Sequence, residues 1–324
     1  MKLLLVLLLA VTTAKAQLAG AVTGTHDPAI AEDHGHFYVF ATGGARPGQL
    51  PVRCSPNLKN WTRCGAVFPA GIPAWIAAIS PATPDLWAPD VSFFDGLFHL
   101  YYVFSIIGKQ TSGIALVTSP TLDPATAVWT DHGLVLQTSE RDDFNAIDPN
   151  LILDEHGDPW LVFGSFWSGI KLRRIDRATG LLDPHEKKQY SLAARAEGTA
   201  IEAPFLFHHD GFYYLFVSWD LCCRGAASTY RTMVGRSEKI TGPYKDRNGK
   251  KMIDGGGTAV LTATPTWAGP GGASLLHVDD GDSPRDVIAF HAYSTATGRP
   301  SLRISTITWQ DGWPTATVDD PAPQ

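Results

Sequence analysis

Residues 145–170 read NAIDPNLILDEHGDPWLVFGSFWSGI, and this stretch has a clear internal order. An acidic residue stands next to a proline (Asp148-Pro149), and a short apolar run follows from Leu151 to Leu153. A turn from Asp154 to Asp158 then leads to a second apolar run from Trp160 to Phe163. Two such runs joined by a turn rich in Asp and Gly predict a β-hairpin.

The same order recurs along the chain. Clear copies read HDPAIAEDHGHFYVFATG (26–43), WAPDVSFFDGLFHLYYVFS (87–105) and IEAPFLFHHDGFYYLFVSWD (201–220), and a weaker fifth copy spans 271–293. Such copies are typical of a radial repeat, because one hairpin is too small to bury its own face. Two further strand-like runs follow each hairpin, the last of them being Leu302 to Trp309 and a short tail. We therefore predict an all-β, five-bladed β-propeller with four strands per blade. A two-sheet sandwich is the alternative, but it does not explain the repeated acid-proline opening.

Composition limits the class of protein. A chain of 324 residues can hold one large all-β domain, and no linker or charge run marks a second one, so we expect a single domain over residues 17–324. The 23 Pro and 31 Gly suit many short strands joined by turns. The formal net charge is −6 and no basic face is evident, which argues against a nucleic-acid partner.

The N-terminus has the features of an export signal. Lys2 precedes an apolar run from Leu3 to Val11, and Ala14-Lys15-Ala16 matches a small-x-small cleavage site. The apolar run is too short to span a bilayer, which disfavours a membrane anchor. We therefore predict a signal peptide over residues 1–16 and a secreted protein, extracellular or periplasmic, with no membrane partner.

Export makes the four cysteines candidates for disulfides. Cys54 and Cys64 flank a strand and turn and could form a local bridge. Cys222 and Cys223 are adjacent, and either a vicinal disulfide or two buried thiols fits them. Neither pair has the spacing of a zinc site, so we interpret all four as structural.

Acidic residues stand at or beside the start of the inner strand in four of the copies: Asp27, Asp90, Asp148 and Glu202. Any one of them could be an ordinary turn acid next to a proline. A propeller, however, gathers these positions around one mouth of its channel. Like charges held close together raise at least one pKa and so create separate acid and base roles. Such a set suits cleavage of a glycosidic bond.

Aromatic residues near the strand ends fit the same chemistry. Trp87, Phe104, Phe166 and Trp167 are predicted to face the region of the carboxylates. The apolar C–H face of a sugar ring stacks on such rings. Packing in the core is the alternative for each of them.

Several motifs together carry a resemblance to a known family. They read GTHDPAI, LWAPDVS, DDFNAIDPN, FGSFWSGIKL, GTAIEAPF, SWDLCCRG, STYRTMVGRS, ITGPY and FHAY, in this order from Gly24 to about Trp313. With these motifs the chain closely resembles the endo-arabinanases of glycoside hydrolase family 43. The CCRG and FWSGI phrases are more similar to the arabinan-cleaving branch than to the xylosidase branches.

The resemblance implies a role for each carboxylate. Asp27, in HDP, matches the general base that activates water, and Glu202, in IEAP, matches the general acid. Asp148, in IDPN, matches the third carboxylate, which raises the pKa of the acid and orients it. The implied substrate is arabinan, a polysaccharide with α-1,5-linked L-arabinofuranosyl units, cleaved with inversion. Inversion requires base and acid to stand about 6.5–9.5 Å apart, so that a water fits between them.

The resemblance also implies residues around the carboxylates. His291, in FHAY, matches a histidine near the propeller axis that contributes to a bound cation, commonly Ca²⁺, mostly through waters. Trp87, Asn145 and Ser165 match positions near the substrate in the family. The expected substrate-binding set also includes Phe166 and Trp167, as the stacking rings named above, and His26, for which a purely orienting role next to Asp27 is the alternative. Asp90 has no catalytic counterpart in the family, so we expect a structural role for it.

Other functions fit parts of the pattern. An exo-acting arabinanase, or another family 43 arabinofuranosidase or xylosidase, would use the same carboxylates. Retaining fructan-cleaving propellers open with Asn-Asp-Pro, whereas this chain has His26-Asp27-Pro28. A carbohydrate-binding propeller without catalysis is expected to lack at least one of the three carboxylates, and a protein-interaction propeller needs no acidic pocket. We expect a monomer.

Overall fold

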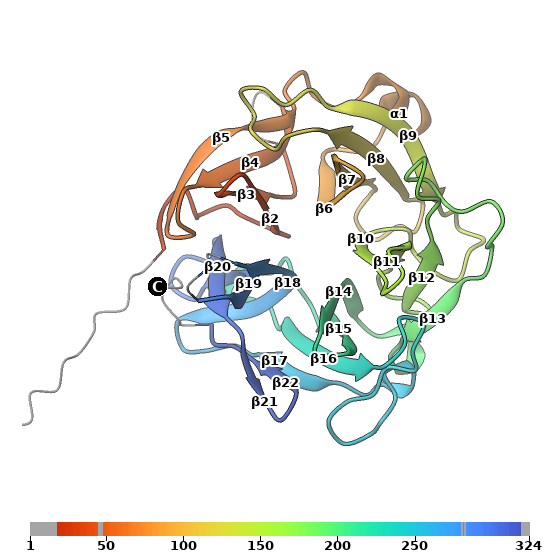
Figure 1. Ribbon diagram of the computed structural model, residues 1–324, viewed down its shortest axis with the longest axis vertical. Coiled ribbons are helices and arrows are strands. Elements are labelled where there is room, and N and C mark those ends of the chain that lie inside the picture. Colours follow the sequence, from red (N-terminus) through yellow and green to blue (C-terminus); the bar gives the residue numbers. More distant parts are fainter. Residues whose placement is uncertain (1–17, 45–47, 280, 282, 319–324) are drawn as a thin grey trace, which may run out of the picture.

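Five β-sheets are arranged around a central axis, each with its innermost strand toward that axis (Figure 1). The computed structural model describes residues 18–44, 48–279, 281 and 283–318. The predicted signal peptide, residues 1–16, lies outside the described residues. The prediction of an all-β, five-bladed propeller is confirmed.

The first four blades each contain four antiparallel strands in chain order, from the axis outward. Blade 1 has β2 (Ala29–Asp33), β3 (His36–Phe40), β4 (Gln49–Ser55) and β5 (Asn60–Phe68). Blade 2 has β6 (Leu86–Phe94), β7 (Leu97–Phe104), β8 (Gly113–Ser119) and β9 (Thr130–Gln137). Blade 3 has β10 (Asn150–Leu153), β11 (Pro159–Phe163), β12 (Ile170–Arg174) and β13 (Tyr190–Ala193). Blade 4 has β14 (Ile201–His209), β15 (Phe212–Trp219), β16 (Arg231–Ser237) and β17 (Thr258–Leu261).

Blade 5 differs from the prediction of four strands. Its sheet has three, β18 (Trp267–Val278), β19 (Arg285–Ser294) and β20 (Pro300–Thr306), while β21 (Thr308–Gln310) and β22 (Trp313–Thr315) form a separate hairpin. The run from Leu302 to Trp309, predicted as one strand, therefore breaks at Ile307. The strand breaks because the following residues turn toward blade 4. Trp309 stacks on His209 of blade 4, and Trp313 packs into the core between blades 4 and 5.

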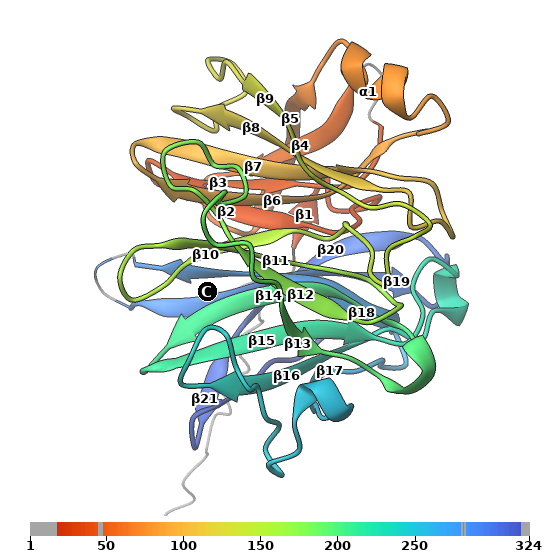
Figure 2. The same ribbon diagram turned by 90° about the vertical axis from the view of Figure 1, so that its right-hand side faces the viewer.

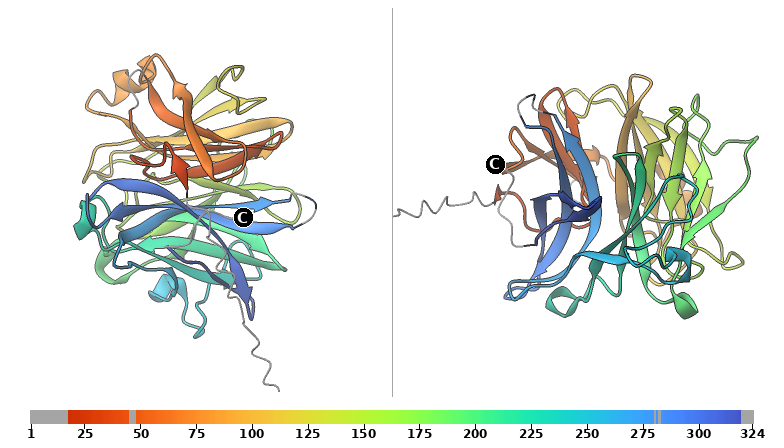
Figure 3. Two further views of the ribbon diagram at one scale, coloured as in Figure 1. Left: turned by 90° about the vertical axis from the view of Figure 1, so that its left-hand side faces the viewer. Right: turned by 60° about the horizontal axis from the view of Figure 1, so that its bottom comes forward.

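The inner strands form a closed ring. β2, β6, β10, β14 and β18 each contact the next one around the axis, and β18 contacts β2. In side view the strands run along the axis (Figure 2). The first and last blades, red and blue in Figure 3, lie side by side. All five hairpin starts therefore meet at one end of a common channel.

The hydrophobic core is divided among the blade interfaces. Five clusters of buried side chains lie between consecutive blades, and each draws residues from two neighbouring sheets. For example, Phe40 of β3 and Phe104 of β7 belong to the cluster between blades 1 and 2. This arrangement is the side-by-side packing that the repeated hairpin requires, because no blade has a core of its own.

The N-terminal segment links the two ends of the ring. β1 (Ala19–Gly20) pairs in parallel with β5, and Thr23 bridges to Ser301 of β20. The buried guanidinium of Arg53 donates hydrogen bonds from Nε to the carbonyl of Ala21 (2.7 Å) and from Nη2 to that of Gly24 (3.1 Å). The segment before the first blade is thus tied to blade 1 and to blade 5.

Helices contribute little. α1 (Ala74–Ile79) and three short 3-10 helices, η1 (Ala196–Gly198), η2 (Gly225–Ala227) and η3 (Met252–Asp254), lie in loops. Within the described part of the chain, none of the helices has the length and hydropathy needed to cross a bilayer. Both cysteine pairs are disulfides, Cys54–Cys64 and Cys222–Cys223, which confirms the local bridge and resolves the adjacent pair as a vicinal disulfide.

Candidate active site

One residue in each blade repeats an unusual backbone conformation, either shortly before the inner strand (β2, β10) or at an irregularity within it (β6, β14, β18). Asp27, Ala88, Asp148, Ala203 and Gly272 all have a positive φ, of 46°, 39°, 55°, 50° and 60°. In the first four blades a proline follows. Left-handed backbone at non-glycine residues carries strain and is common at functional sites. The five positions line a small cavity of about 40 Å³ between the blades.

Only two of the four acidic candidates occupy this position. Asp27 and Asp148 do so in blades 1 and 3, while Glu202 precedes the equivalent Ala203 by one residue. Asp90 follows Ala88 by two residues and is directed between blades. Its carboxylate accepts hydrogen bonds from Asn150 Nδ2 and from the backbone N–H of Leu151, both at 2.9 Å. The expectation of a structural role for Asp90 agrees with these contacts.

One cavity of about 890 Å³ opens at this end of the channel. All the predicted site residues except His291 line it: His26, Asp27, Trp87, Asn145, Asp148, Ser165, Phe166, Trp167 and Glu202. Ser165, Phe166 and Trp167 follow β11, and both aromatic residues have a positive φ (51° and 41°). Phe104 was predicted to face the same region, and that was wrong. Its side chain is 1% exposed because it packs in the core against Trp75.

The Asp27 carboxylate is held by two donors. Oδ2 lies 2.8 Å from Nδ1 of His26 and accepts a hydrogen bond from the Thr42 hydroxyl at 2.6 Å. Burial acts to raise the pKa of Asp27, but the charge and hydrogen bond of His26 outweigh it, with smaller contributions from His291 and Thr42. The pKa therefore lies well below its ordinary value. Asp27 is an ionised carboxylate at neutral pH, as a general base must be.

The pKa values of Glu202 and Asp148 are raised, in contrast to that of Asp27. Glu202 accepts hydrogen bonds from Ser165 (2.6 Å) and Tyr230, and Asp148 accepts one from the backbone N–H of Ala203 (3.0 Å). Burial raises the pKa of Glu202 against these hydrogen bonds, and the charge of Asp27 adds to the rise. Burial, then the charges of Glu202 and Asp27, raise the pKa of Asp148 well above its ordinary value. Ionisation of both carboxyl groups at once is therefore disfavoured.

His26 and His291 are stacked beside Asp27, with ring centroids 3.9 Å apart. The backbone N–H of Asp27 donates to Nδ1 of His291 at 3.2 Å. Burial, and then the charge of His26, lower the pKa of His291 to about 3, so its ring is neutral and carries its proton on Nε2. This buried N–H has no hydrogen-bond partner among the residues that the structure describes.

These contacts limit how His291 can hold a cation. A protonated Nε2 cannot ligate a metal ion directly, but it can donate to a water that belongs to the coordination shell of an ion. His26, Asp27 and His291 also form a cluster whose ligand atoms lie within 4.8 Å of one another. The residues present therefore fit an oxygen-preferring cation held mainly through water, as Ca²⁺ can be.

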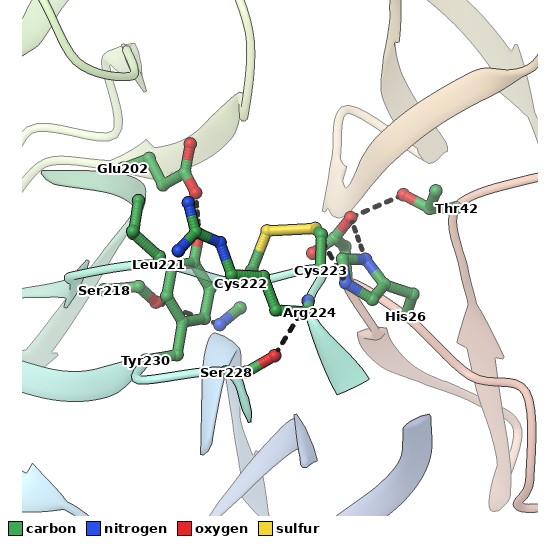
Figure 4. Close-up of a disulfide and its surroundings, with 12 residues drawn as sticks. His26, Thr42, Glu202, Ser218, Leu221, Cys222, Cys223, Arg224, Ser228 and Tyr230 are labelled. Carbon is green, nitrogen blue, oxygen red and sulfur yellow. Dashed lines mark hydrogen bonds and ion pairs between the residues drawn. A yellow bond between two sulfur atoms is a disulfide. The ribbon is translucent and has the colours of Figure 1, made fainter. Parts of the chain in front are cut away.

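Several residues of the site were missed by the sequence analysis. Thr42 holds Asp27, Tyr230 donates to Glu202, and the Tyr293 hydroxyl lies 2.7 Å from Nε2 of His26. The vicinal disulfide also lines the cavity. In the view of Figure 4 it lies between Glu202 and Tyr230 on one side and His26 and Thr42 on the other. Tyr293 had a signal, since it follows His291 by two residues and so shares its strand face.

Comparisons with known proteins show which family the chain is related to. The chain is 40% identical over 291 residues to an extracellular endo-α-(1→5)-L-arabinanase of Bacillus subtilis, covering 89% of this chain and 86% of that protein. It is 38% identical over 306 residues to an extracellular exo-α-(1→5)-L-arabinofuranosidase of Cellvibrio japonicus, covering 89% and 85%.

Solved structures give the same result. A family 43 endo-arabinanase from Bacillus licheniformis superposes with a TM-score of 0.84 at 40% identity, covering 93% of this chain and 99% of that one. A Cellvibrio cellulosa α-L-arabinanase in complex with arabinohexaose superposes with a TM-score of 0.86 at 36% identity, covering 94% and 99%. The model for glycosyl hydrolases family 43 matches residues 22–314. The chain therefore belongs to glycosyl hydrolase family 43.

Proposed function

We propose that this protein is an endo-acting arabinanase that hydrolyses α-1,5-linked L-arabinan with inversion. The observation that carries the proposal is the opposed ionisation of carboxyl groups in one cavity, with a lowered pKa for Asp27 and a raised pKa for Glu202. Relatives at 40% and 38% identity that act on arabinan or its α-1,5 linkage support the choice of substrate.

The proposed mechanism uses each carboxyl group once. Asp27, ionised and oriented by His26 and Thr42, takes a proton from a water that attacks the anomeric carbon. Glu202, protonated, donates a proton to the departing sugar oxygen. Asp148 supports this second role, because the charge of either carboxylate disfavours ionisation of the other. The carboxyl separation of about 6.5–9.5 Å that inversion needs stays a prediction.

Substrate binding is proposed for the residues that line the cavity. Trp87, Phe166 and Trp167 offer rings for the apolar faces of arabinofuranosyl units. Asn145 is 3% exposed, and its side-chain oxygen has no hydrogen-bond partner among the described residues. This oxygen suits a sugar hydroxyl, since a buried acceptor without a partner is costly.

We also propose that a cation, Ca²⁺ by its preference for oxygen, binds through water against His291. When bound, it adds positive charge near the carboxylates. Metal analysis of the purified protein and the melting temperature before and after chelation test this proposal. We expect stoichiometric Ca²⁺ and a lower melting temperature after chelation, restored by Ca²⁺. A metal-free protein with an unchanged melting temperature contradicts it.

Two further features complete the proposal. Residues 1–16 act as a signal peptide and residues 17–324 as one catalytic domain that works outside the cytoplasm as a monomer. Extracellular relatives support export. N-terminal sequencing of the protein from culture medium, and its mass in solution, test these points. An intact N-terminus, or retention inside the cell, contradicts the signal peptide.

The deciding experiment is digestion of linear, debranched arabinan, with products resolved by size over time and by anomeric configuration. A mixture of oligosaccharides at early times, with inverted configuration, is the expected result. A single short product from the start would favour exo action, the second candidate, which the 38% identical exo-acting relative supports. No product from arabinan overturns the proposed substrate.

A further inference from the structure

A loop from blade 4 carries the vicinal disulfide into the cavity. Between β15 and β16 the chain leaves the blade, and Cys222 and Cys223 both line the cavity. The loop is closed at its base, where the backbone N–H of Thr229 donates to the carbonyl of Leu221 at 2.8 Å. The Ser228 hydroxyl accepts from the backbone N–H of Arg224 at 3.0 Å. The loop is therefore braced by hydrogen bonds directly before and directly after the disulfide.

The disulfide contacts two other blades. The backbone N–H of Cys223 donates to the hydroxyl of Tyr293, in blade 5, at 3.0 Å. The same hydroxyl lies 2.7 Å from Nε2 of His26, which precedes blade 1. Sγ of Cys223 is itself 3.6 Å from that ring nitrogen. Both contacts converge on one edge of the His26 ring.

The opposite edge of this ring holds the base. Nδ1 of His26 lies 2.8 Å from Oδ2 of Asp27. A continuous path of contacts thus runs from Cys223 through Tyr293 and His26 to the Asp27 carboxylate. Since the ring of His26 is held at both nitrogens, its orientation, and with it that of the carboxylate, depends on where the Cys223 N–H points.

The disulfide fixes that direction. Cys223 has φ of 66°, a left-handed conformation that is unfavourable for a residue with a side chain. A bond between the side chains of adjacent residues closes a small ring that includes the peptide between them. The ring leaves the backbone of Cys223 little freedom to relax to a negative φ, which would turn its N–H away from Tyr293.

We propose that the Cys222–Cys223 disulfide is a positioning element for catalysis, which holds the base Asp27 in its reactive orientation through Tyr293 and His26. The inference rests on the proposed role of Asp27. Misplacement of a catalytic group by a fraction of an ångström to 1 Å lowers turnover on the order of tenfold to a hundredfold. Loss of the disulfide should therefore reduce kcat and leave substrate affinity largely intact.

The chain provides a matched control. The second disulfide, Cys54–Cys64, joins the neighbouring strands β4 and β5 and does not line the cavity. Replacement of Cys54 and Cys64 by Ala tests what the loss of any disulfide does to this fold. Replacement of Cys222 and Cys223 by Ala tests the positioning role. Thermal unfolding of each variant establishes that it is folded at the assay temperature.

Kinetics on arabinan then separate positioning from a structural role. We expect kcat to fall roughly tenfold or more in the Cys222→Ala/Cys223→Ala variant, with KM within about threefold of wild type, and no such loss in the control. Tyr293→Phe should show a similar loss. Because both changes break one path, their combination should cost little more than either alone. Independent, multiplicative losses overturn the inference, and so does a raised KM with unchanged kcat.

A second measurement needs no substrate. The ¹⁵N chemical shifts of the His26 ring report its hydrogen bonds, and they should change in the Cys222→Ala/Cys223→Ala and Tyr293→Phe variants but not in the control. Unchanged shifts in the first of these variants overturn the inference. If arabinan is not the substrate, this readout still decides it, so the two proposals fail separately.

Discussion

At the level of single residues, Glu202 offers the most direct test of the chemistry. Glutamine has the same shape and can stay between Ser165 and Tyr230, but it cannot donate a proton to a leaving oxygen. We expect Glu202→Gln to lower kcat on arabinan by roughly 10²–10⁴-fold, the usual contribution of general acid catalysis. Binding of arabino-oligosaccharides, measured by calorimetry, should persist. Turnover close to that of wild type removes Glu202 from the acid role.

The pKa of Glu202 depends on two neighbours with opposite effects. Tyr230 donates a hydrogen bond that favours the ionised form, whereas the charge of either Asp148 or Glu202 disfavours ionisation of the other. A general acid works only while protonated, so activity is lost as the pH rises through its pKa. Tyr230→Phe should move the alkaline limb of the kcat/KM profile to higher pH, and Asp148→Asn should move it to lower pH. Shifts in the same direction contradict this assignment.

The residues that could be predicted are those whose position repeats. Asp27 and Asp148 were visible because an acid-proline pair opens their hairpins, and the structure explains the pair by a shared left-handed backbone. Tyr230 contacts Glu202 from the far side of the same blade, and Thr42 accepts a hydrogen bond from Ala88 of the next blade, and no local pattern signals contacts between residues so far apart in the chain. The prediction for Phe104 was wrong because the sequence pattern of an aromatic residue at a strand end is the same whether its side chain faces a cavity or the core.

At the level of the strand, the irregularity around Gly272 within β18 shows why blade 5 departs from the acid-proline pattern. A Cβ at Gly272 would lie 2.9 Å from Nδ1 of His291 and 3.0 Å from Oδ1 of Asp27. Only glycine leaves this space to the base. Gly272→Ala should therefore displace Asp27 and lower kcat on the order of tenfold or more. Steady-state kinetics on arabinan measure the change.

Gly35 provides the matched control for this prediction. It also has a positive φ (77°), but a Cβ there would meet nothing within 4 Å. Gly35→Ala should cost about 1–2 kcal/mol of stability for the left-handed backbone and leave kcat unchanged. If both variants lose kcat equally, backbone strain is the cause and not contact with Asp27.

Between blades 2 and 3, Asp90 holds two neighbouring inner strands together. Asp90→Ala leaves the side-chain N–H of Asn150 and the backbone N–H of Leu151 without their acceptor, at a cost of about 2–4 kcal/mol. Burial raises the pKa of Asp90 to about 6, above its value in the unfolded chain. Its contribution to stability is therefore greatest in acid and falls as the pH rises from about 4 to about 6.

The cost of Asp90→Ala should accordingly be larger at pH 5 than at pH 7.5, by about 1 kcal/mol. Denaturant unfolding at the two pH values measures it. Arg177→Ala is the control, because it removes an exposed ion pair to Asp95 that also joins blades 2 and 3, and such pairs contribute little. A cost for Asp90→Ala that grows toward pH 7.5 contradicts the raised pKa.

At the level of the whole molecule, the sequence predicted what repeats and missed what occurs once. Five hairpins gave five blades, and the need to bury each hairpin gave their packing side by side. The separate hairpin of β21 and β22, the loop that carries Cys223 to His26, and the ring closure each occur once. Each depends on contacts between residues far apart in the chain, for which a repeat supplies no second copy to compare.

Ring closure gives the last prediction. Arg53 is 2% exposed and ties the segment before blade 1 to β4 through the carbonyls of Ala21 and Gly24. Gly24 in turn donates to the carbonyl of Pro300 in blade 5 (2.8 Å), and Asp27 lies three residues further on. Arg53→Met keeps the length of the side chain but removes both charge-assisted hydrogen bonds. It should cost about 2–4 kcal/mol and lower the melting temperature by several degrees.

The neighbouring arginine separates ring closure from the mere loss of a charge. Arg63 is exposed and lies opposite Arg53 on the neighbouring strand. Burial of Arg53, and to a smaller extent the positive charge of Arg63, lower the pKa of the Arg53 guanidinium to about 10. Arg63→Met relieves this repulsion, so it should leave the melting temperature unchanged or slightly raised. In Arg53→Met, the melting temperature measured by calorimetry and the activity on arabinan should both fall, because the segment that closes the ring leads directly to Asp27. Equal melting of the two variants would mean that the blade interfaces close the ring without this segment.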